Sequence, residues 1–181
     1  TENKNATFEI VAPSSNPVSV TISSNATTAN EGDTISFSST VSGNISAVSY
    51  KWDFHNDGYV DSTSAAPIYA YSTNGTYAVN LTVSDSKWNQ TDLEIITVRK
   101  LHNVTIFVKD NATKSPIENA EVELDDELRN TASDGIASYA KNAGRYSLTV
   151  KKHGYSSFSN KTEIEDNAIV EVSLMEEDIK A

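Results

Sequence analysis

Runs in which apolar and polar residues alternate follow one another along almost the whole chain. In one of them Val79, Leu81 and Val83 stand at every second position, and the residues between them are polar. A period of two places the apolar side chains on one face of a β-strand, and turn-forming pairs such as Asn74-Gly75 separate the runs. The runs predicted as strands are 7–11, 17–23, 34–41, 46–54, 67–71, 77–84, 93–98, 104–109, 120–124, 128–132, 136–140, 146–151, 158–164 and 168–175. Many short strands at this spacing predict an all-β protein.

One stretch in the first half of the chain carries a specific combination of motifs. A predicted strand ends in Trp52-Asp53-Phe54 and runs into a turn that contains Asp57-Gly58, and Gly75-Thr76-Tyr77 then opens a strictly alternating strand. This combination resembles the PKD domain, an Ig-like β-sandwich of extracellular proteins, over residues 14–99. Such domains are usually spacers and contact modules, so the resemblance implies a role without catalysis.

A second set of motifs follows in the other half of the chain. Pro116-Ile117 stands just before Ala120 and Val122, and Asp134-Gly135, Gly144-Arg145-Tyr146 and Gly154-Tyr155 come later in that order. The order resembles the carboxypeptidase regulatory-like family, a prealbumin-like sandwich, over residues 102–175. Asp134-Gly135 is a typical hairpin turn between alternating runs. The shared Gly-x-Tyr motif predicts in both halves a tyrosine whose hydroxyl ties down a loop.

These patterns divide the chain of 181 residues into three parts. Residues 1–13 form a strand-like N-terminal extension, 14–99 a PKD-like sandwich, and 100–181 a carboxypeptidase regulatory-like sandwich. The predicted fold class is therefore all-β, with two tandem Ig-like β-sandwich domains.

Composition excludes several classes of function. The chain has no cysteine, so a disulfide framework and a cysteine-based metal or redox site are excluded. Its net charge of −11 repels nucleic acid and anionic membranes, and neither is predicted as a partner. No apolar run approaches the roughly 18 residues of a membrane span.

Sequons for N-glycosylation are enriched. The composition alone predicts about four Asn-x-Ser/Thr sequences, and the chain has nine. They are Asn5, Asn25, Asn44, Asn74, Asn80, Asn89, Asn103, Asn111 and Asn160. The enrichment favours a secreted glycoprotein over a polar surface without glycans, and alternation places Asn80 and Asn103 opposite the apolar faces of their strands. Many sequons without cysteine suit an archaeal cell surface.

The turn that begins at Asp53 has the spacing of a calcium loop. Asp53, Asp57 and Asp61 occupy steps one, five and nine, with a glycine at step six. His55 at step three is a poor ligand for calcium, and the alternative is that the Asp53 and Asp57 side chains accept hydrogen bonds from turn amides. Calcium is the only cofactor that the sequence suggests.

Two further segments are candidate contact sites. Trp88 lies in a predicted loop, where it either contacts a partner or stacks on sugar, or instead packs on its own sandwich or the other domain. Residues 7–11 place Phe8 and Ile10 on one strand face. Three alternatives are open for this segment. It is the end of an upstream domain, or it folds back on its own chain, or it inserts into a neighbouring subunit.

The predicted function is that of a structural or adhesive module. The chain has neither a His-Glu-x-x-His helix motif nor a Gly-x-Ser-x-Gly elbow, so no catalytic residue and no enzyme is predicted. We expect an extracellular cell-surface glycoprotein that serves as a spacer or as a subunit of a surface layer or filament. Its partners would be copies of itself or other cell-surface proteins. The alternatives are the accessory domains of a secreted hydrolase and a carbohydrate-binding module that uses Trp88.

Overall fold

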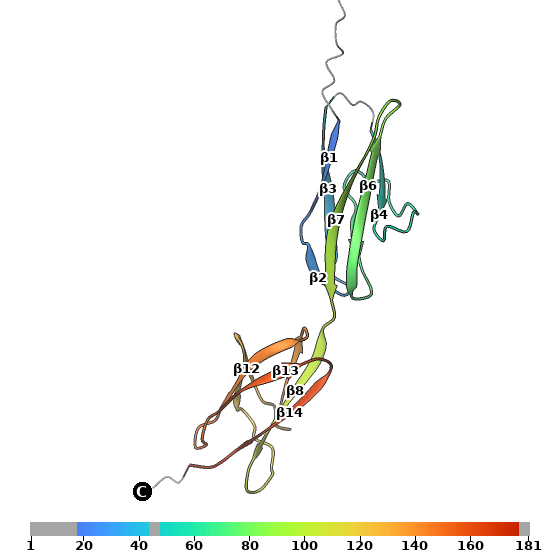
Figure 1. Ribbon diagram of the computed structural model, residues 1–181. Coiled ribbons are helices and arrows are strands. Elements are labelled where there is room, and N and C mark those ends of the chain that lie inside the picture. The colour runs from blue at the N-terminus through green and yellow to red at the C-terminus, as the bar shows by residue number, and fades with distance from the viewer. Residues whose placement is uncertain (1–17, 44–47, 178–181) are drawn as a thin grey trace, which may run out of the picture. The chain divides into compact units, whose positions relative to one another are not determined.

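The computed structural model describes residues 18–43 and 48–177, and in this part of the chain every element is a strand (Figure 1). The chain divides after Val98 into two compact units. Each unit is a sandwich of two sheets with its own hydrophobic core. The predicted fold class, all-β with two tandem Ig-like sandwiches, is confirmed.

The first unit packs a three-stranded sheet against a four-stranded one. The first sheet has the order β1-β3-β5 and the second the order β2-β7-β6-β4. The strands are β1 (Ser19–Ser24), β2 (Thr28–Asn30), β3 (Thr34–Ser42), β4 (Ser49–Asp53), β5 (Ile68–Ala70), β6 (Gly75–Ser84) and β7 (Asn89–Arg99). The long pairing of β6 with β7 places Gly75 opposite Val98 and Ser84 opposite Asn89, so it holds the unit together from end to end.

Aromatic side chains dominate the core of the first unit. Trp52 is fully buried, its ring centroid lies 5.8 Å from that of Phe37, and its indole N–H donates to the carbonyl of Ser64 at 2.9 Å. Phe54 continues the stack, 5.1 Å from Phe37. The alternation that predicted these strands is therefore the alternation between core and surface.

The second unit packs the sheet β11-β8-β14 against the sheet β10-β9-β12-β13. Strand β14 runs parallel to β8, and the other pairs are antiparallel. The strands are β8 (His102–Asp110), β9 (Glu121–Leu124), β10 (Glu127–Asn130), β11 (Ile136–Lys141), β12 (Gly144–Lys151), β13 (Phe158–Ile164) and β14 (Ala168–Leu174). Its core is mainly aliphatic, with Val104, Ile106, Leu124 and Leu148 among the fully buried residues.

Both predicted tyrosine corners are confirmed. The Tyr77 hydroxyl donates to the carbonyl of Thr73 at 2.7 Å, and the Tyr146 hydroxyl donates to that of Asn142 at 2.8 Å. In each unit the tyrosine ties the start of a long strand to the loop before it.

The structure departs from the predictions at two points. Strand β2 was not predicted, because three residues are too short to show a period. The Asp134-Gly135 turn is not a hairpin turn, since β10 and β11 belong to different sheets. The chain crosses from one sheet to the other there, and the turn closes with a hydrogen bond from the Gly135 amide to the Ala132 carbonyl at 2.9 Å.

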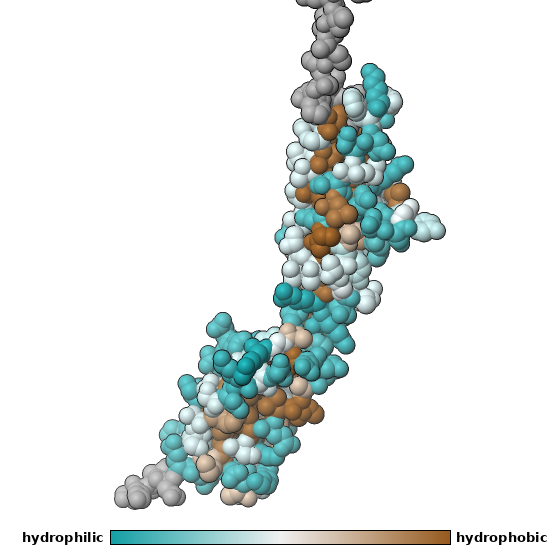
Figure 2. Space-filling model, viewed as in Figure 1, coloured by the Kyte–Doolittle hydropathy of each residue, from teal (hydrophilic) through white to brown (hydrophobic). Residues whose placement is uncertain are grey.

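The predicted N-terminal extension, 1–13, lies outside the described residues, and with it Phe8 and Ile10. Among the residues described, no helix is long and apolar enough to cross a membrane. Figure 2 shows hydrophilic side chains over much of the visible face, with hydrophobic ones in small groups.

Candidate functional site

The acidic turn at the end of β4 folds back along the strand from which it starts. Trp52 donates its amide to the carbonyl of Ser62 at 2.8 Å, and the Asp61 amide donates to the carbonyl of Trp52 at 2.8 Å. Strand β4 is the last strand of its sheet. The returning segment therefore occupies the backbone groups of Trp52 that would otherwise lie at an open edge.

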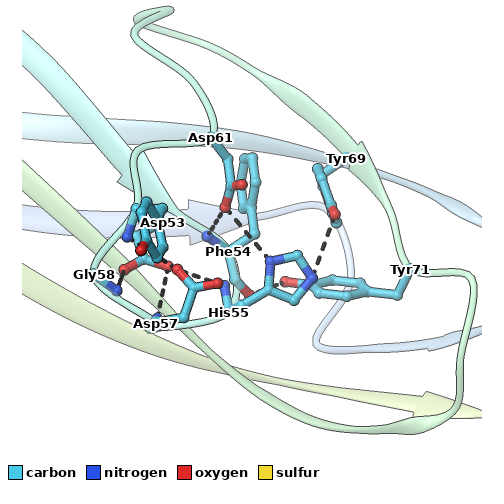
Figure 3. A network of polar contacts seen from close by, with 9 residues as sticks. Asp53, Phe54, His55, Asp57, Gly58, Asp61, Tyr69 and Tyr71 are labelled. Atoms are coloured by element: carbon cyan, nitrogen blue, oxygen red, sulfur yellow. Dashed lines mark hydrogen bonds and ion pairs between the residues drawn. The ribbon is translucent and has the colours of Figure 1, made fainter.

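The Asp53 carboxylate organises the first half of this turn (Figure 3). Its Oδ2 accepts the amide of Gly58 at 2.8 Å, and its Oδ1 accepts those of His55 and Asp57, each at 3.2 Å. Desolvation is the largest influence on this carboxyl and would raise its pKa, but the amide hydrogen bonds of Gly58, Asp57 and His55 together hold the pKa below its ordinary value. The ionised side chain thus stabilises the turn at neutral pH, and this contribution is lost as the pH falls through the lowered pKa.

The other two aspartates of the turn also accept amides. Asp57 Oδ1 accepts the amide of Tyr59 at 2.9 Å, and Asp61 Oδ2 accepts that of Phe54 at 2.7 Å. Figure 3 shows Asp61 on the opposite side of the turn from Asp53. The second half of the turn is therefore held to the first by side chain to backbone contacts.

His55 lies in a cage of aromatic rings beside the turn. Its Nδ1 is 3.6 Å from Asp61 Oδ2, and its Nε2 is 3.4 Å from the Tyr69 hydroxyl. The rings of Tyr69, Tyr71 and Tyr77 meet the imidazole edge to face, with centroids 5.6, 5.8 and 5.8 Å away. The buried Tyr71 hydroxyl donates to the Phe54 carbonyl at 2.9 Å, and burial raises the pKa of Tyr71.

Sequence reasoning missed this aromatic cage. Tyr69 and Tyr71 fall in a predicted strand, but nothing in their spacing indicates that they meet His55. Two tyrosines two positions apart in a strand next to an aromatic core were the only available clue.

The carboxylates of the three aspartates engage the backbone of the turn itself. Both oxygens of Asp53 and one each of Asp57 and Asp61 accept amide hydrogens, whereas a calcium site needs six to eight converging oxygens. In residues 18–43 and 48–177, no group of three or more His, Asp or Glu side chains is arranged to hold a metal ion. Calcium binding stays a prediction, and the hydrogen bonds favour the alternative of a turn held by its own amides.

Thermal unfolding with and without calcium distinguishes a calcium site from a turn that is held only by hydrogen bonds. We expect the thermal midpoint in calcium chloride and in a chelator to be the same. Asp57→Ala should lower the midpoint equally in both, because it removes one hydrogen bond worth about 1 kcal/mol. A chelator that lowers the midpoint of the wild type but not of Asp57→Ala would establish a calcium site.

Trp88 lies in the turn between β6 and β7. Its side chain is 41% exposed, and its amide donates to Asp85 Oδ1 at 2.7 Å. The pairing of Ser84 with Asn89 places this turn at the end of the sandwich opposite to Arg99. An exposed indole on a hydrogen-bonded turn is available for contact with another molecule.

The sequon asparagines of the described part lie almost all at the surface. Six are exposed, namely Asn25, Asn74, Asn89, Asn103, Asn111 and Asn160. Asn80 is half-buried, because its Nδ2 donates to Asn56 Oδ1 at 3.3 Å under the acidic turn. Asn5 and Asn44 lie outside the described residues.

No arrangement typical of nucleophilic catalysis occurs in the described residues. His55 contacts Asp61 and tyrosines, and His102 Nδ1 lies 3.2 Å from Asp166 Oδ1. None of the three imidazoles, those of His55, His102 and His153, has a hydrogen bond to a serine or threonine hydroxyl in this part of the chain. The pair that activates such a nucleophile is thus missing from these residues.

Comparison with curated proteins found no significant match. Among solved structures, the chain is similar to the Bacillus anthracis TIE protein, with 13% identity over 92% of this chain and 42% of that one and a TM-score of 0.38. It is also similar to three N-terminal domains of the bacteriophage RB49 outer capsid protein Hoc, with 15% identity over 86% and 59% and a TM-score of 0.39. For BcpA, the major pilin subunit of Bacillus cereus, the identity is 8% over 88% and 71%, and the TM-score is 0.44.

The chain spans less than two thirds of the TIE chain, at 42%, and of the Hoc chain, at 59%. The resemblance of residues 102–175 to the carboxypeptidase regulatory-like family stays a prediction. The family model of the PKD domain matches residues 14–99, which confirms the resemblance that the motifs around Trp52 and Tyr77 indicate for this part of the chain.

Proposed function

We propose that this chain is a structural module of an extracellular cell-surface glycoprotein, without catalytic activity. In this role two sandwiches in tandem serve as a spacer or as a subunit of a surface layer or filament. The partners are other copies of the chain or other cell-surface proteins. The number of sequons and the absence of cysteine favour an archaeal surface.

The observation that carries the proposal is the placement of the sequons. An oligosaccharide can be attached only where the asparagine side chain reaches solvent. Six of the seven sequon asparagines in the described residues are exposed, and they belong to both units. If the asparagines only reflected a polar composition, Ser or Thr would stand two positions after them about four times. The chain has nine such sequences, which is about twice that number.

The interiors of the two units support a structural role. Both cores are filled by side chains that are almost completely buried. The acidic turn, which is the sharpest site candidate in the sequence, uses its carboxylates to hold its own backbone. Since PKD domains are usually spacers and contact modules, the family match over residues 14–99 points the same way.

Mass spectrometry of natively sourced protein tests the proposal. We expect glycans at the exposed asparagines, so that the mass of the native protein falls when they are removed and exceeds the mass of its bare polypeptide. Asn80 should have the lowest occupancy of the described sequons, because Asn56 engages its amide nitrogen and the acidic turn restricts access to it. The bare polypeptide mass would contradict the proposal.

A further inference from the structure

The outward face of strands β6 and β7 in the first unit carries no charged side chain. Directly opposite residues of an antiparallel pair lie on the same face of a sheet. Val79 and Leu81 of β6 are fully buried and face the core, so the alternate residues of β6 and their partners on β7 face outward. The outward residues are Thr76, Ala78, Asn80, Thr82 and Ser84 on β6 and Asn89, Thr91, Leu93, Ile95 and Thr97 on β7. All of them are uncharged, in a chain with 14 basic and 25 acidic residues.

An apolar patch lies within this face. Leu93 and Ile95 stand two positions apart on β7, and each is 49% exposed. Ala78 of β6 pairs with Ile95, and these three residues form the β7 patch. Each of the two larger side chains leaves about half of its surface in contact with water. Covering the patch would therefore be favourable.

Two sequon asparagines stand on the same face as the β7 patch. Asn80 lies directly opposite Leu93, but its Nδ2 donates to Asn56 Oδ1 at 3.3 Å. Asn89 is the first residue of β7 and is exposed. Its side chain makes no hydrogen bond within residues 18–43 and 48–177. Asn89 can therefore carry an oligosaccharide without the loss of a contact, whereas Asn80 cannot.

A glycan on Asn89 would leave the strand on the side of the β7 patch. Asn89, Thr91, Leu93 and Ile95 alternate with residues that face the core, so their side chains project from the same face. At about 3.4 Å per residue, Leu93 lies about 14 Å along the strand from Asn89, which a glycan of several sugar rings can span. Between them, the Thr91 hydroxyl has no hydrogen-bond partner in the described part of the chain and can bond to a sugar hydroxyl.

We propose that the oligosaccharide on Asn89 lies along β7 and covers Leu93 and Ile95. The inference rests on the proposed glycoprotein role and names what one of the glycans does. Sugar rings suit this surface, because they present hydroxyls together with apolar C–H groups. The face likewise presents threonine hydroxyls beside aliphatic side chains. Since the glycan is covalently attached to the same strand, its effective concentration at the patch is high.

A second copy of the chain fits the β7 patch less well. A stable protein interface buries about 800 Å² on each partner, or about 20 to 30 residues a side. The β7 patch is confined to Ala78, Leu93 and Ile95, and polar residues surround it on both strands. An oligosaccharide on Asn89 would also stand between two such faces and keep them apart.

Thermal unfolding of the glycosylated chain tests the proposal. Both tryptophans of the chain, Trp52 and Trp88, belong to the first unit, so tryptophan fluorescence follows the unfolding of that unit. Asn89→Gln removes the glycan and should lower the thermal midpoint by about 4 °C or more. The matched control is Asn74→Gln, which removes a glycan from an exposed asparagine just before β6, at the other end of the same sandwich. It should leave the midpoint unchanged, and in the chain produced without glycans neither substitution should have an effect.

A double variant assigns the effect to the β7 patch. In Leu93→Thr/Ile95→Thr, removal of the Asn89 glycan should no longer lower the midpoint, because the aliphatic carbons that it covers are absent. Solution NMR gives a second measurement that does not depend on stability. Protons of the Asn89 glycan should show nuclear Overhauser contacts with the methyl groups of Leu93 and Ile95.

Several results would overturn the assignment of the β7 patch. They are an Asn89 that carries no glycan, equal effects of Asn89→Gln and Asn74→Gln, or an effect of Asn89→Gln that persists in the double variant. A dimer that the double variant dissociates would also overturn it, since the patch would then join copies of the chain. Glycans at the other asparagines would in each case leave the structural role intact. A native protein without any glycan would contradict both proposals, so the two failures are distinguishable.

Discussion

Gly135→Ala should destabilise the second unit by at least about 3 kcal/mol. Gly135 has a φ of +76°, where a residue with a Cβ atom is strained by about 1 to 2 kcal/mol. A Cβ atom built there would also lie 2.6 Å from the Val108 carbonyl oxygen and 2.9 Å from Cβ of Pro116. Neither neighbour can move easily, because the Val108 amide donates to the Gly135 carbonyl at 2.8 Å and Pro116 forms a β-bridge with Lys109.

Substitutions at two other glycines separate the two causes of the expected loss of stability, which are the steric contact of the new Cβ atom and the strain of the backbone. Gly32 and Gly154 each have a φ of +82°, and nothing lies within 4 Å of a Cβ atom built on them. Alanine at either should therefore cost only the backbone strain, about 1 kcal/mol. Chemical denaturation of the three variants measures the difference. If Gly135→Ala lowers the free energy of unfolding no more than Gly154→Ala in the same unit, the contact with Val108 does not exclude a Cβ atom at residue 135.

The strands could be predicted from the sequence because their pattern is local. In β8, and in β6 from Val79 onward, every second residue is buried, and this period is visible without any knowledge of the neighbouring strands. Strand β2 has no such period, since it is defined by its pairing with β7 rather than by its own residues. The error at Asp134-Gly135 has the same origin. The pair specifies a turn, but the sheet to which the next strand belongs is decided by packing.

The sequence predicted where the acidic turn lies, but not whether its carboxylates bind a metal ion or accept hydrogen bonds from the turn. The spacing of Asp53, Asp57 and Asp61 fits a metal loop and a hydrogen-bonded turn equally well, because both place carboxylates near backbone amides. What distinguishes the two arrangements is whether three or more such side chains converge on one point, and no group in residues 18–43 and 48–177 does so. The cage around His55 depends on Tyr69, Tyr71 and Tyr77, whose contacts with the imidazole are set by the fold rather than by a local pattern.

The exposure of surface residues was also predictable only in part from the local pattern. Alternation placed Asn103 outward, where it is exposed. The same argument placed Asn80 opposite the apolar face of β6, and it does lie there, but the acidic turn folds over it. Whether an edge strand is covered is likewise not a local property. Asp92 caps β1 from a distance of 70 residues along the chain.

Thr131→Val should destabilise the second unit by about 3 kcal/mol. Thr131 is only 2% exposed, and its hydroxyl joins two backbone groups of one turn. It accepts the Ala120 amide at 2.9 Å and donates to the Ile117 carbonyl at 2.6 Å. Valine has the same shape but no hydroxyl, so the buried amide and the buried carbonyl would both lose their partners, at about 1 to 3 kcal/mol each.

The matched variants isolate the hydroxyl from the rest of the side chain. Thr131→Ser keeps both hydrogen bonds and should cost about 1 kcal/mol, the value of a buried methyl group. Thr97→Val, on β7 of the first unit, alters no sequon and removes a hydroxyl for which no hydrogen bond occurs within residues 18–43 and 48–177, so it should change stability by less than about 0.5 kcal/mol. Denaturant unfolding at neutral pH provides the comparison. Equal losses for Thr131→Val and Thr131→Ser would show that packing of the methyl group, and not the bridge between Ala120 and Ile117, holds the turn that precedes β9.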